Sequence, residues 1–379
     1  MASARRPLEG LTVVAVEQAV AAPFCTSRLA DAGARVIKIE RPEGDFARGY
    51  DDVAKGQSSY FVWLNRGKES LVLDLASAQG KATLRDLIDG ADVLVQNLKP
   101  GALGRLGFAP ETLRQSHPRP ICCSISGYGD TGPLAERKAY DLLIQAESGH
   151  ASITGGPEAP ARVGLSIVDL ATGATAHAAI LEALIARGIT GSGADIRVSM
   201  FDVMAEWLTV PLLHEEGGKP PRRIGLAHPS IAPYGVFATR DGRQILISIQ
   251  SDREWVMFCR EFLGRAELAA DEGLSRNVAR VRNRERTDAI VAAAFLVVDE
   301  VEAKEALLRA EVAFASVNDM AALAVHPHLR RITVETEAGP VSLPAPAPVV
   351  VGAARDYGRV PAIGEHDAPD APAAGRRAS

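Results

Sequence analysis

The chain has few cysteines, few aromatic residues and no excess of basic residues. Its 379 residues include only 4 cysteines, and no two of them form a C-x-x-C pair, so neither a zinc site nor a disulfide framework is predicted and no metal ligands are assigned. Aromatic residues make up 5% of the chain, whereas Ala, Gly and Val are plentiful, which favours α/β layers. The formal net charge of −5 argues against a nucleic-acid partner, which would require a basic face.

The N-terminal region also lacks a long hydrophobic run. The apolar stretch that begins at residue 11 lies between Glu9 and Glu17, and it is too short for a signal peptide or a membrane-spanning segment. We therefore expect a soluble cytoplasmic protein with no membrane partner and with reduced, buried cysteines. A chain of this length can form two domains.

Strand-like and helix-like patterns alternate along the first half of the chain. Residues 11–17 and 35–40 are predicted as strands, on either side of a helix that Pro23 opens and that ends near Gly33. Helices follow at 77–90 and 110–116, before the strands DVLVQN and PICCSIS. This alternation predicts an α/β fold with a Rossmann-like large domain, whose parallel sheet places ligands at the carboxyl ends of its strands.

A smaller α+β domain is expected after the large one. The stretch HEEGGKPPRR is polar and rich in Pro and Gly, which indicates a linker after the helix FDVMAEWLTVPLL. Residues 1–213 are therefore assigned to the large domain, and residues 214–330 to the small domain with its linkers, including the hairpin GVFATRDGRQILISI. Residues 331–379 are predicted to return to the large domain as extended chain and to end in a tail.

One glycine-rich segment matches a known motif only in part. GYGDTG follows a predicted strand and satisfies G-x-G-x-x-G, which is typical of dinucleotide-binding loops. Pro133 and the unperiodic AERK stand where that motif requires a helix N-terminus. We interpret the segment as a turn-rich loop and keep a dinucleotide-dependent oxidoreductase as an alternative.

Two acidic residues, Asp141 and Asp169, are the candidates for chemistry. Asp141 enters an otherwise apolar helix, and Asp169 lies between GLSIV and an Ala-rich helix over 169–187. Asp169 is predicted as the N-cap of that helix. In that position the helix dipole and free amides would keep its carboxylate ionised and nucleophilic. A capping role and a catalytic role are compatible.

Eight segments resemble the class III CoA-transferases, which include formyl-CoA transferase and the carnitine and dicarboxylate CoA-transferases, with the α-methylacyl-CoA racemases as relatives. In order along nearly the whole chain they are PLEGLTVVAVEQAVAAPF, LADAGARVIKIERPEGD, NRGKESLVLDL, ADVLVQNLKPGALGRLGF, SISGYGDTGP, AYDLLIQAESG, RVGLSIVDLATG and GSGADIRVSMFD. The resemblance implies a CoA-transferase of EC 2.8.3 type in an interlocked homodimer. Its substrates would be acyl-CoA thioesters and carboxylic acids, with no permanently bound cofactor.

The resemblance also implies roles for individual residues. The nucleophile falls on Asp169, with Asp141 orienting the site. The CoA contacts fall on Arg41, Asn97, Leu98, Arg105, Lys138 and Tyr140, among which the basic side chains suit phosphate groups. GLAHPSIAPYG (225–235) resembles a segment of transferases that use succinyl-CoA with dicarboxylates such as glutarate, itaconate or mesaconate. The candidates for binding a substrate carboxylate are therefore His228, Ser230, Arg222 and Arg223.

Two positions distinguish the branches of this family. Tyr140 stands where the racemases have a histidine base, and a phenol with an ordinary pKa of about 10 is a poor base. Racemization is therefore disfavoured, and it stays an alternative beside a non-catalytic CoA-binding protein. Val20 stands where formyl-CoA transferase has a glutamine, which disfavours formate or oxalate. The implied reaction passes through a mixed anhydride and an aspartyl-CoA thioester, either between two acids or within one dicarboxylic acid.

Overall fold

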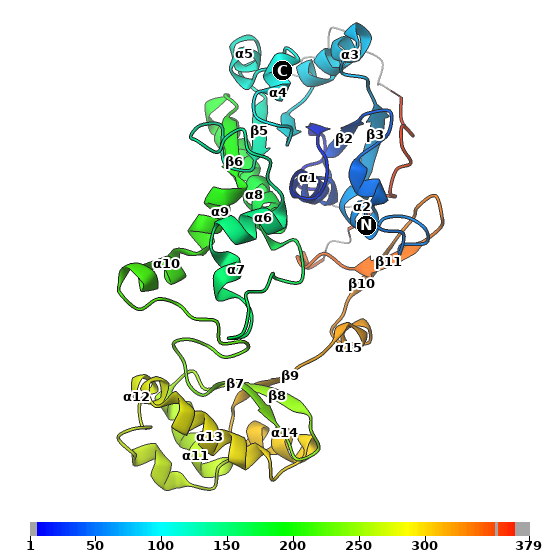
Figure 1. The fold of residues 1–379 in the computed structure, drawn as a ribbon. Coiled ribbons are helices and arrows are strands. Elements are labelled where there is room, and N and C mark those ends of the chain that lie inside the picture. Colours follow the sequence, from blue (N-terminus) through cyan, green and yellow to red (C-terminus); the bar gives the residue numbers. More distant parts are fainter. Residues whose placement is uncertain (1–5, 353–354, 368–379) are drawn as a thin grey trace. The chain divides into compact units, whose positions relative to one another are not determined.

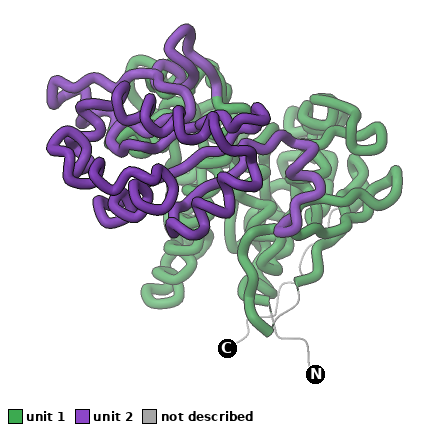
Figure 2. Tube along the Cα trace, turned by 90° about the horizontal axis from the view of Figure 1, so that it is seen from below, with its two compact units in different colours: residues 1–150, 163–210, 330–379 green, residues 151–162, 211–329 purple. Residues whose placement is uncertain are grey.

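The computed structural model describes residues 6–352 and 355–367. The chain forms two compact units, which are coloured separately in Figure 2. Unit 1 comprises residues 1–150, 163–210 and 330–379, and unit 2 comprises residues 151–162 and 211–329. The assignment of residues 151–162 to unit 2 had no counterpart in the sequence analysis, because this short stretch carries no helical or strand periodicity.

Unit 1 is built on a six-stranded parallel sheet with the strand order β3-β2-β1-β4-β5-β6 (Figure 1). Its strands are β1 (Thr12–Val16), β2 (Arg35–Glu40), β3 (Lys68–Val72), β4 (Val93–Gln96), β5 (Ile121–Ser126) and β6 (Asp195–Ser199). In the parallel register, Val13 of β1 pairs with Val36 of β2 and Val93 of β4. The α/β prediction is confirmed. The strand order reverses between β1 and β4, which is where open sheets of this kind bind ligands.

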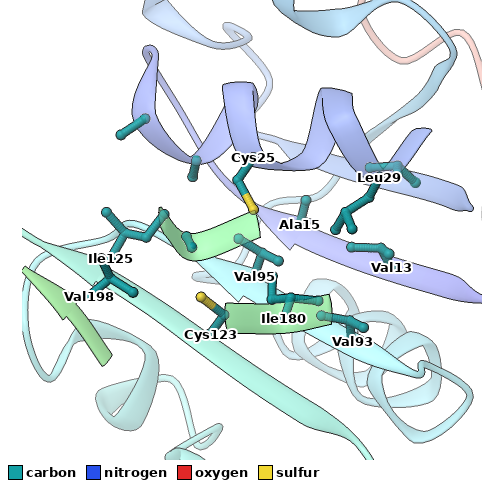
Figure 3. Packing of buried hydrophobic residues seen from close by; sticks show 14 of the residues in the cluster. Val13, Ala15, Cys25, Leu29, Val93, Val95, Cys123, Ile125, Ile180 and Val198 are labelled. Carbon is teal, nitrogen blue, oxygen red and sulfur yellow. The ribbon is translucent and has the colours of Figure 1, made fainter. Parts of the chain in front are cut away.

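Helices cover both faces of this sheet. The helical elements of unit 1 are α1 (Ala21–Asp31), η1 (Phe46–Gly49), α2 (Ser59–Asn65), α3 (Ala78–Asp89), α4 (Ala102–Arg105), α5 (Pro110–Ser116), α6 (Asp141–Glu147), α8 (Ile167–Thr190) and α9 (Met200–Trp207). Val13 and Ala15 of β1 face a core shared with α1 and α8 (Figure 3). Val14 and Val16 face a second core with α3. Because successive strand residues point to opposite faces, β1 is hydrophobic from Val13 to Val16.

The first turns of α8 pack closely against α1. A Cβ added at Gly173 would lie 2.4 Å from the carbonyl oxygen of Ala21, so only glycine allows this approach. At the other end of α8, Arg187 pairs with Asp92 before β4, with 3.1 Å between Nη2 and Oδ1. The start of α8 is therefore fixed near the carboxyl ends of the strands. This 24-residue helix is apolar enough to span a membrane by length and composition alone, a test that core helices of soluble proteins also pass.

A buried ionic cluster lies under the loops that follow β1 and β2. Lys38 Nζ is 2.8 Å from Asp45 Oδ2, and Lys68 Nζ is 2.6 Å from Glu17 Oε1; all four side chains are fully buried. The other carboxylate oxygen of Asp45 accepts the backbone amide of Ala19 at 3.1 Å. The cluster thus holds the loop between β1 and α1, in which Ala19 has a φ of 64°.

Unit 2 is built on a three-stranded antiparallel sheet of β7 (Tyr234–Ala238), β8 (Gln244–Ser248) and β9 (Ala313–Ser316). Its helical elements, two of which begin in unit 1, are α7 (His150–Ile153), α10 (Thr209–Glu216), α11 (Asp252–Glu261), η2 (Ala266–Ala270), α12 (Asn277–Arg282), α13 (Arg284–Phe295), α14 (Glu300–Arg309) and α15 (Met320–Ala324). Trp255, Phe258 and Phe295 are fully buried in its core. The predicted β7–β8 hairpin is confirmed.

One prediction of local structure is wrong, and one strand pairing was not predicted. The single helix expected over 201–213 is divided into α9 and α10, because Pro211 has no amide to donate to the carbonyl of Trp207. The stretch after residue 331, predicted as extended chain, contains two strands, β10 (Arg331–Val334) and β11 (Val341–Pro344), which pair in a hairpin that packs on Phe61 of α2. This pairing depends on a partner surface far away in the sequence, so local patterns did not indicate it.

Candidate functional site

Asp169 lies in the first turn of α8. The helix begins at Ile167 with Ser166 as its N-cap residue, so Asp169 is its third residue and the N-cap prediction is wrong. The reason is that another side chain caps this helix. Asp141 Oδ2 accepts the backbone amides of Val168 at 2.8 Å and of Asp169 at 3.2 Å. The amides that were expected to stabilise a charged Asp169 are therefore occupied by Asp141.

The Asp141 carboxylate is held by a third donor. Asp141 is the first residue of α6 and is buried, and its Oδ1 accepts Gln145 Nε2 at 2.5 Å. Gln145 is fully buried, and its Oε1 accepts the amide of Val163 at 3.0 Å. The sequence analysis missed Gln145. Its spacing of four residues from Asp141 on one helix was the available signal.

The carboxyl group of Asp169 has a strongly raised pKa. Partial burial disfavours its charged form, and the nearby negative charge of Asp141 adds to this, which raises the pKa from 3.8 to about 7. The expectation that Asp169 is held fully ionised is therefore wrong. At neutral pH the ionised and protonated forms coexist, and the ionised form is a more basic nucleophile than an ordinary aspartate.

Two tyrosines that the sequence analysis did not single out surround the start of α8. The hydroxyl of Tyr60 lies 3.4 Å from the hydroxyl of Ser166, and the ring of Tyr50 packs edge-on against Tyr60 with 5.6 Å between centroids. Burial, followed by the charges of Asp45 and Asp169, raises the pKa of Tyr50 to about 12. Tyr50 therefore stays protonated and can act as a hydrogen-bond donor.

The residues predicted to contact CoA come from loops at the carboxyl ends of β2, β4 and β5. The side chain of Asn97 spans the point where the strand order reverses: its Oδ1 accepts the amide of Gln18 at 2.9 Å, and its Nδ2 donates to the carbonyl of Gln18 at 2.8 Å. The amide of Leu98 donates to Gln96 Oε1 at 2.8 Å. Asn97 thus shapes the loop after β1, and its side chain is already bonded within the protein.

The three basic candidates are exposed at this edge. Arg41 follows β2, and its Nε donates to the carbonyl of Gly44 at 3.2 Å. Arg105 ends α4, and Lys138 lies in the loop between β5 and α6, two residues before the half-exposed Tyr140. Exposed guanidinium and ammonium groups at the carboxyl edge suit an anionic ligand.

The GYGDTG segment is a loop closed at its base. A Cβ added at Gly127 would lie 2.2 Å from the Cβ of Ala139, so the two ends of the loop touch. The next helix, α6, begins only at Asp141. A dinucleotide motif requires a helix directly after the glycines, and this segment does not supply one.

The candidates for binding a substrate carboxylate all belong to unit 2. The guanidinium of Arg223 donates to the carbonyls of Ser152, Gly156 and Pro157 at 2.9–3.2 Å and thereby holds residues 152–157. Arg222 is exposed. His228 Nδ1 accepts the amide of Ser230 at 3.1 Å, and its ring stacks on Tyr234 with 5.2 Å between centroids. The second ring nitrogen of His228 therefore carries the proton and can donate a hydrogen bond.

Comparisons with known proteins agree on one family. Residues 8–369 match CoA-transferase family III. The chain is 42% identical over 288 residues to the acetyl-CoA:oxalate CoA-transferase of Acetobacter aceti, covering 75% of this chain and 74% of that protein. It is 34% identical over 384 residues to the succinate–glutarate CoA-transferase of Agrobacterium fabrum, covering 97% and 96%. A crystal structure of a CAIB/BAIF family protein from Brucella suis superposes with a TM-score of 0.80 at 34% identity, covering 95% and 97%.

Proposed function

Because the chain belongs to CoA-transferase family III, we propose that it moves CoA between carboxylic acids in a reaction of EC 2.8.3 type, with Asp169 as the covalent nucleophile. The observation that carries this proposal is the placement of Asp169 beside Asp141, whose carboxyl oxygens accept three hydrogen bonds within the protein. That placement raises the basicity of the Asp169 carboxylate, so that its ionised form attacks a thioester more readily.

The reaction proceeds in two symmetrical halves. In the first half, an Asp169 oxygen attacks the donor thioester carbonyl and expels CoA thiolate, which leaves a mixed anhydride. The thiolate then attacks the aspartyl carbonyl, which forms an aspartyl-CoA thioester and releases the donor acid. In the second half, the acceptor carboxylate attacks this thioester, and the thiolate cleaves the new anhydride at the acceptor carbonyl. Acceptor-CoA leaves, and Asp169 is a carboxylate again.

Every intermediate of this cycle is an acyl derivative of a carboxylic acid. Donor, enzyme and product thioesters have similar energies, so that no step is a trap and no permanently bound cofactor is required. The anhydride must be kept away from water. Asp141 orients the first turn of α8, and Tyr50 can donate a hydrogen bond near the reacting carbonyl.

CoA is proposed to bind at the carboxyl edge of the sheet in unit 1. Arg41, Arg105 and Lys138 would contact its phosphates, because all three are exposed cations on loops that follow strands. Leu98 and Tyr140 would line its path. Asn97 would act indirectly, since it holds the backbone of the loop after β1.

Dicarboxylic acids are the proposed acyl partners. The names of relatives include glutarate, and the C4–C5 acids succinate, glutarate, itaconate and mesaconate form the first test set, with transfer either between two acids or within one. Oxalate is added to this set because a 42% identical relative is named for it, although Val20 argues against it. Arg222, His228 and Ser230 are proposed to bind the distal carboxylate, whereas Arg223 holds its neighbouring loop.

An α-methylacyl-CoA racemase is the second candidate, since a carboxyl group with a pKa of about 7 also suits proton transfer. That reaction needs a second base on the opposite face of the α-carbon. The side chain directly before Asp141 is the phenol of Tyr140, and Tyr50 has a pKa of about 12. Phenols of this kind are poor bases at neutral pH, which favours the transferase.

A cytoplasmic homodimer is the proposed form of the protein. In unit 1, apolar side chains on successive helices are exposed: Ile185 and Ile189 of α8 at 68% and 83%, and Trp207 of α9 at 55%. A second copy of the chain would cover such a surface. Light scattering should give twice the monomer mass of 40.1 kDa, and Ile189→Glu should lower it toward that mass.

The transferase proposal is tested by incubating the protein with succinyl-CoA and each acid other than succinate, with products followed by mass spectrometry. Transfer to at least one acid is expected. With donor present, hydroxylamine should convert Asp169 to a hydroxamate. Asp169→Ala should lose all turnover, whereas Asp202→Ala, an exposed first-turn aspartate of α9, should keep it. No transfer to any acid, together with deuterium exchange at an α-carbon, would establish the racemase instead.

A further inference from the structure

We propose that Gln145 is a positioning residue of the Asp169 site: it keeps the Asp141 carboxylate on the first-turn amides of α8 and thereby fixes where Asp169 stands. The inference rests on the proposed role of Asp169 as the nucleophile. It concerns a residue whose side chain bonds to Asp141 and Val163.

The contacts form one continuous chain of hydrogen bonds. Gln145 Nε2 donates to Asp141 Oδ1 at 2.5 Å, and Asp141 Oδ2 accepts the amides of Val168 and Asp169 at 2.8 and 3.2 Å. On its other side, Gln145 Oε1 accepts the amide of Val163 at 3.0 Å. Val163 is the residue at which the chain re-enters unit 1 on its way to α8. The side chain of Gln145 therefore links the segment that leads into α8, at Val163, with the residue that caps α8, Asp141.

Burial makes each of these bonds consequential. Gln145 is 0% exposed and Asp141 is 9% exposed. A buried carboxylate stays ionised only when donors satisfy its oxygens. The first amides of a helix have no partner within the helix, so Asp141 also satisfies two donors that would otherwise be unbonded. Loss of the Gln145 donor leaves Asp141 Oδ1 without this partner, which loosens the cap.

Several titratable groups face this network, and they determine how it responds to pH. Asp141 projects from the start of α6, with His150 near it after the same helix. Tyr140 precedes α6, and Tyr50 and Tyr60 approach from the segment after β2 and from α2. Burial raises the pKa of Tyr50 to about 12, so Tyr50 is neutral, and Asp141 is the charge that, beside burial, raises the pKa of Asp169. Its position decides how strongly Asp169 holds a proton.

Two substitutions of Gln145 separate positioning from simple packing. Gln145→Leu keeps the volume but removes both the donor and the acceptor. Gln145→Glu keeps the shape, and while its new carboxyl is protonated it can still donate to Asp141 and accept from Val163. Once ionised, it repels Asp141. Asn283→Leu is the control, since it also removes a side-chain amide that donates a hydrogen bond, in this case to the carbonyl of Gly273 in unit 2 at 3.0 Å.

The first measurement is hydrogen–deuterium exchange of a peptide that contains Val168 and Asp169, which does not depend on activity. Gln145→Leu should speed the exchange of these two amides at least tenfold, and Asn283→Leu should leave it unchanged. In Gln145→Glu the protection should remain at pH 6 and be lost at pH 9. Circular dichroism identifies any variant that fails to fold. If Gln145→Leu does not fold, the test rests on the difference in amide protection of Gln145→Glu between pH 6 and pH 9.

The second measurement is kcat/KM for CoA transfer over the same pH range. Gln145→Leu should lose at least tenfold at every pH, mainly in kcat. Gln145→Glu should stay within threefold of wild type at pH 6 and lose at least tenfold at pH 9. Unchanged exchange and activity in both variants would overturn the inference. If the wild type transfers no CoA but Gln145→Leu loses amide protection, the proposed reaction fails while the positioning role stands.

Discussion

Replacing Asp169 with asparagine should stabilise the protein, and the gain should grow with pH. The native protein holds the Asp169 proton up to about pH 7, whereas an unfolded chain releases it near pH 3.8. Between these values the native state binds more protons than the unfolded state, so stability falls as pH rises. Asparagine has the same shape and no charge, and it therefore escapes this loss.

The size of the effect follows from the interval between the two pKa values. Each pH unit in that interval is worth about 1.4 kcal/mol, which sets an upper limit of about 4 kcal/mol above pH 7. Because Asp169 is only partly buried, water screens some of this cost, and we expect a gain of about 2 to 4 kcal/mol at pH 8. At pH 4.5 the gain should be about 1 kcal/mol or less, because this pH lies less than one unit above the pKa of the unfolded chain and little of the loss has accumulated.

Urea unfolding followed by circular dichroism at pH 4.5 and pH 8 measures both values. The control is Asp202→Asn, which changes an exposed aspartate in the first turn of α9 and should shift stability by less than about 0.5 kcal/mol at either pH. An equal gain for Asp169→Asn at both pH values would refute the reasoning. It would mean that Asp169 carries no proton at neutral pH and that burial beside Asp141 does not raise its pKa.

Two further predictions compare positions that share an element or a chemistry. Gly173→Ala should destabilise the protein by about 1 to 3 kcal/mol in urea unfolding, because the added Cβ would meet the backbone of α1. Gly188→Ala on the same helix meets open space, so it should be neutral or stabilise the protein by up to about 1 kcal/mol. Equal effects of the two substitutions would contradict the close contact between the helices. Lys38→Met should lower the free energy of unfolding by about 3 to 5 kcal/mol, because it leaves the buried carboxylate of Asp45 without its lysine partner. Arg35→Met breaks an exposed ion pair with Glu69 and should lower it by less than about 1 kcal/mol. Similar losses in the two variants would show that burial of the lysine is not decisive.

The raised pKa of Asp169 also links stability to the proposed chemistry. An aspartate that is costly to ionise in the native state is a stronger base once ionised, so the same burial that lowers stability above pH 7 raises nucleophilicity. The transfer rate should therefore rise with pH through about 7, as the ionised form becomes the main species. The three hydrogen bonds of the Asp141 carboxylate lie within the protein, and Asp169 is the group whose pKa is raised to about 7.

Local pattern was sufficient for the parallel half of the fold. Strands β1, β2, β4 and β5 were expected because buried parallel strands are apolar on both faces, and the pattern of their residues shows this directly. The hairpin of β7 and β8 was expected from its turn at Asp241-Gly242. The hairpin of β10 and β11 was missed because its strands are stabilised by contact with α2, which the sequence places about 270 residues away.

The candidate site, like the fold, could be predicted from the sequence only in part. The sequence by itself determined which residues are the candidates for the chemistry: the two aspartates, the basic residues after the strands and the segment that resembles the family motif. Only the tertiary structure decided how the aspartates differ. Asp141 takes the amides of α8 and the amide of Gln145, whereas Asp169 is left partly buried and holds a proton. The reason is that the charge of a carboxylate depends on which donors reach it and how much water it has lost, and both are set by segments that meet only in the folded chain.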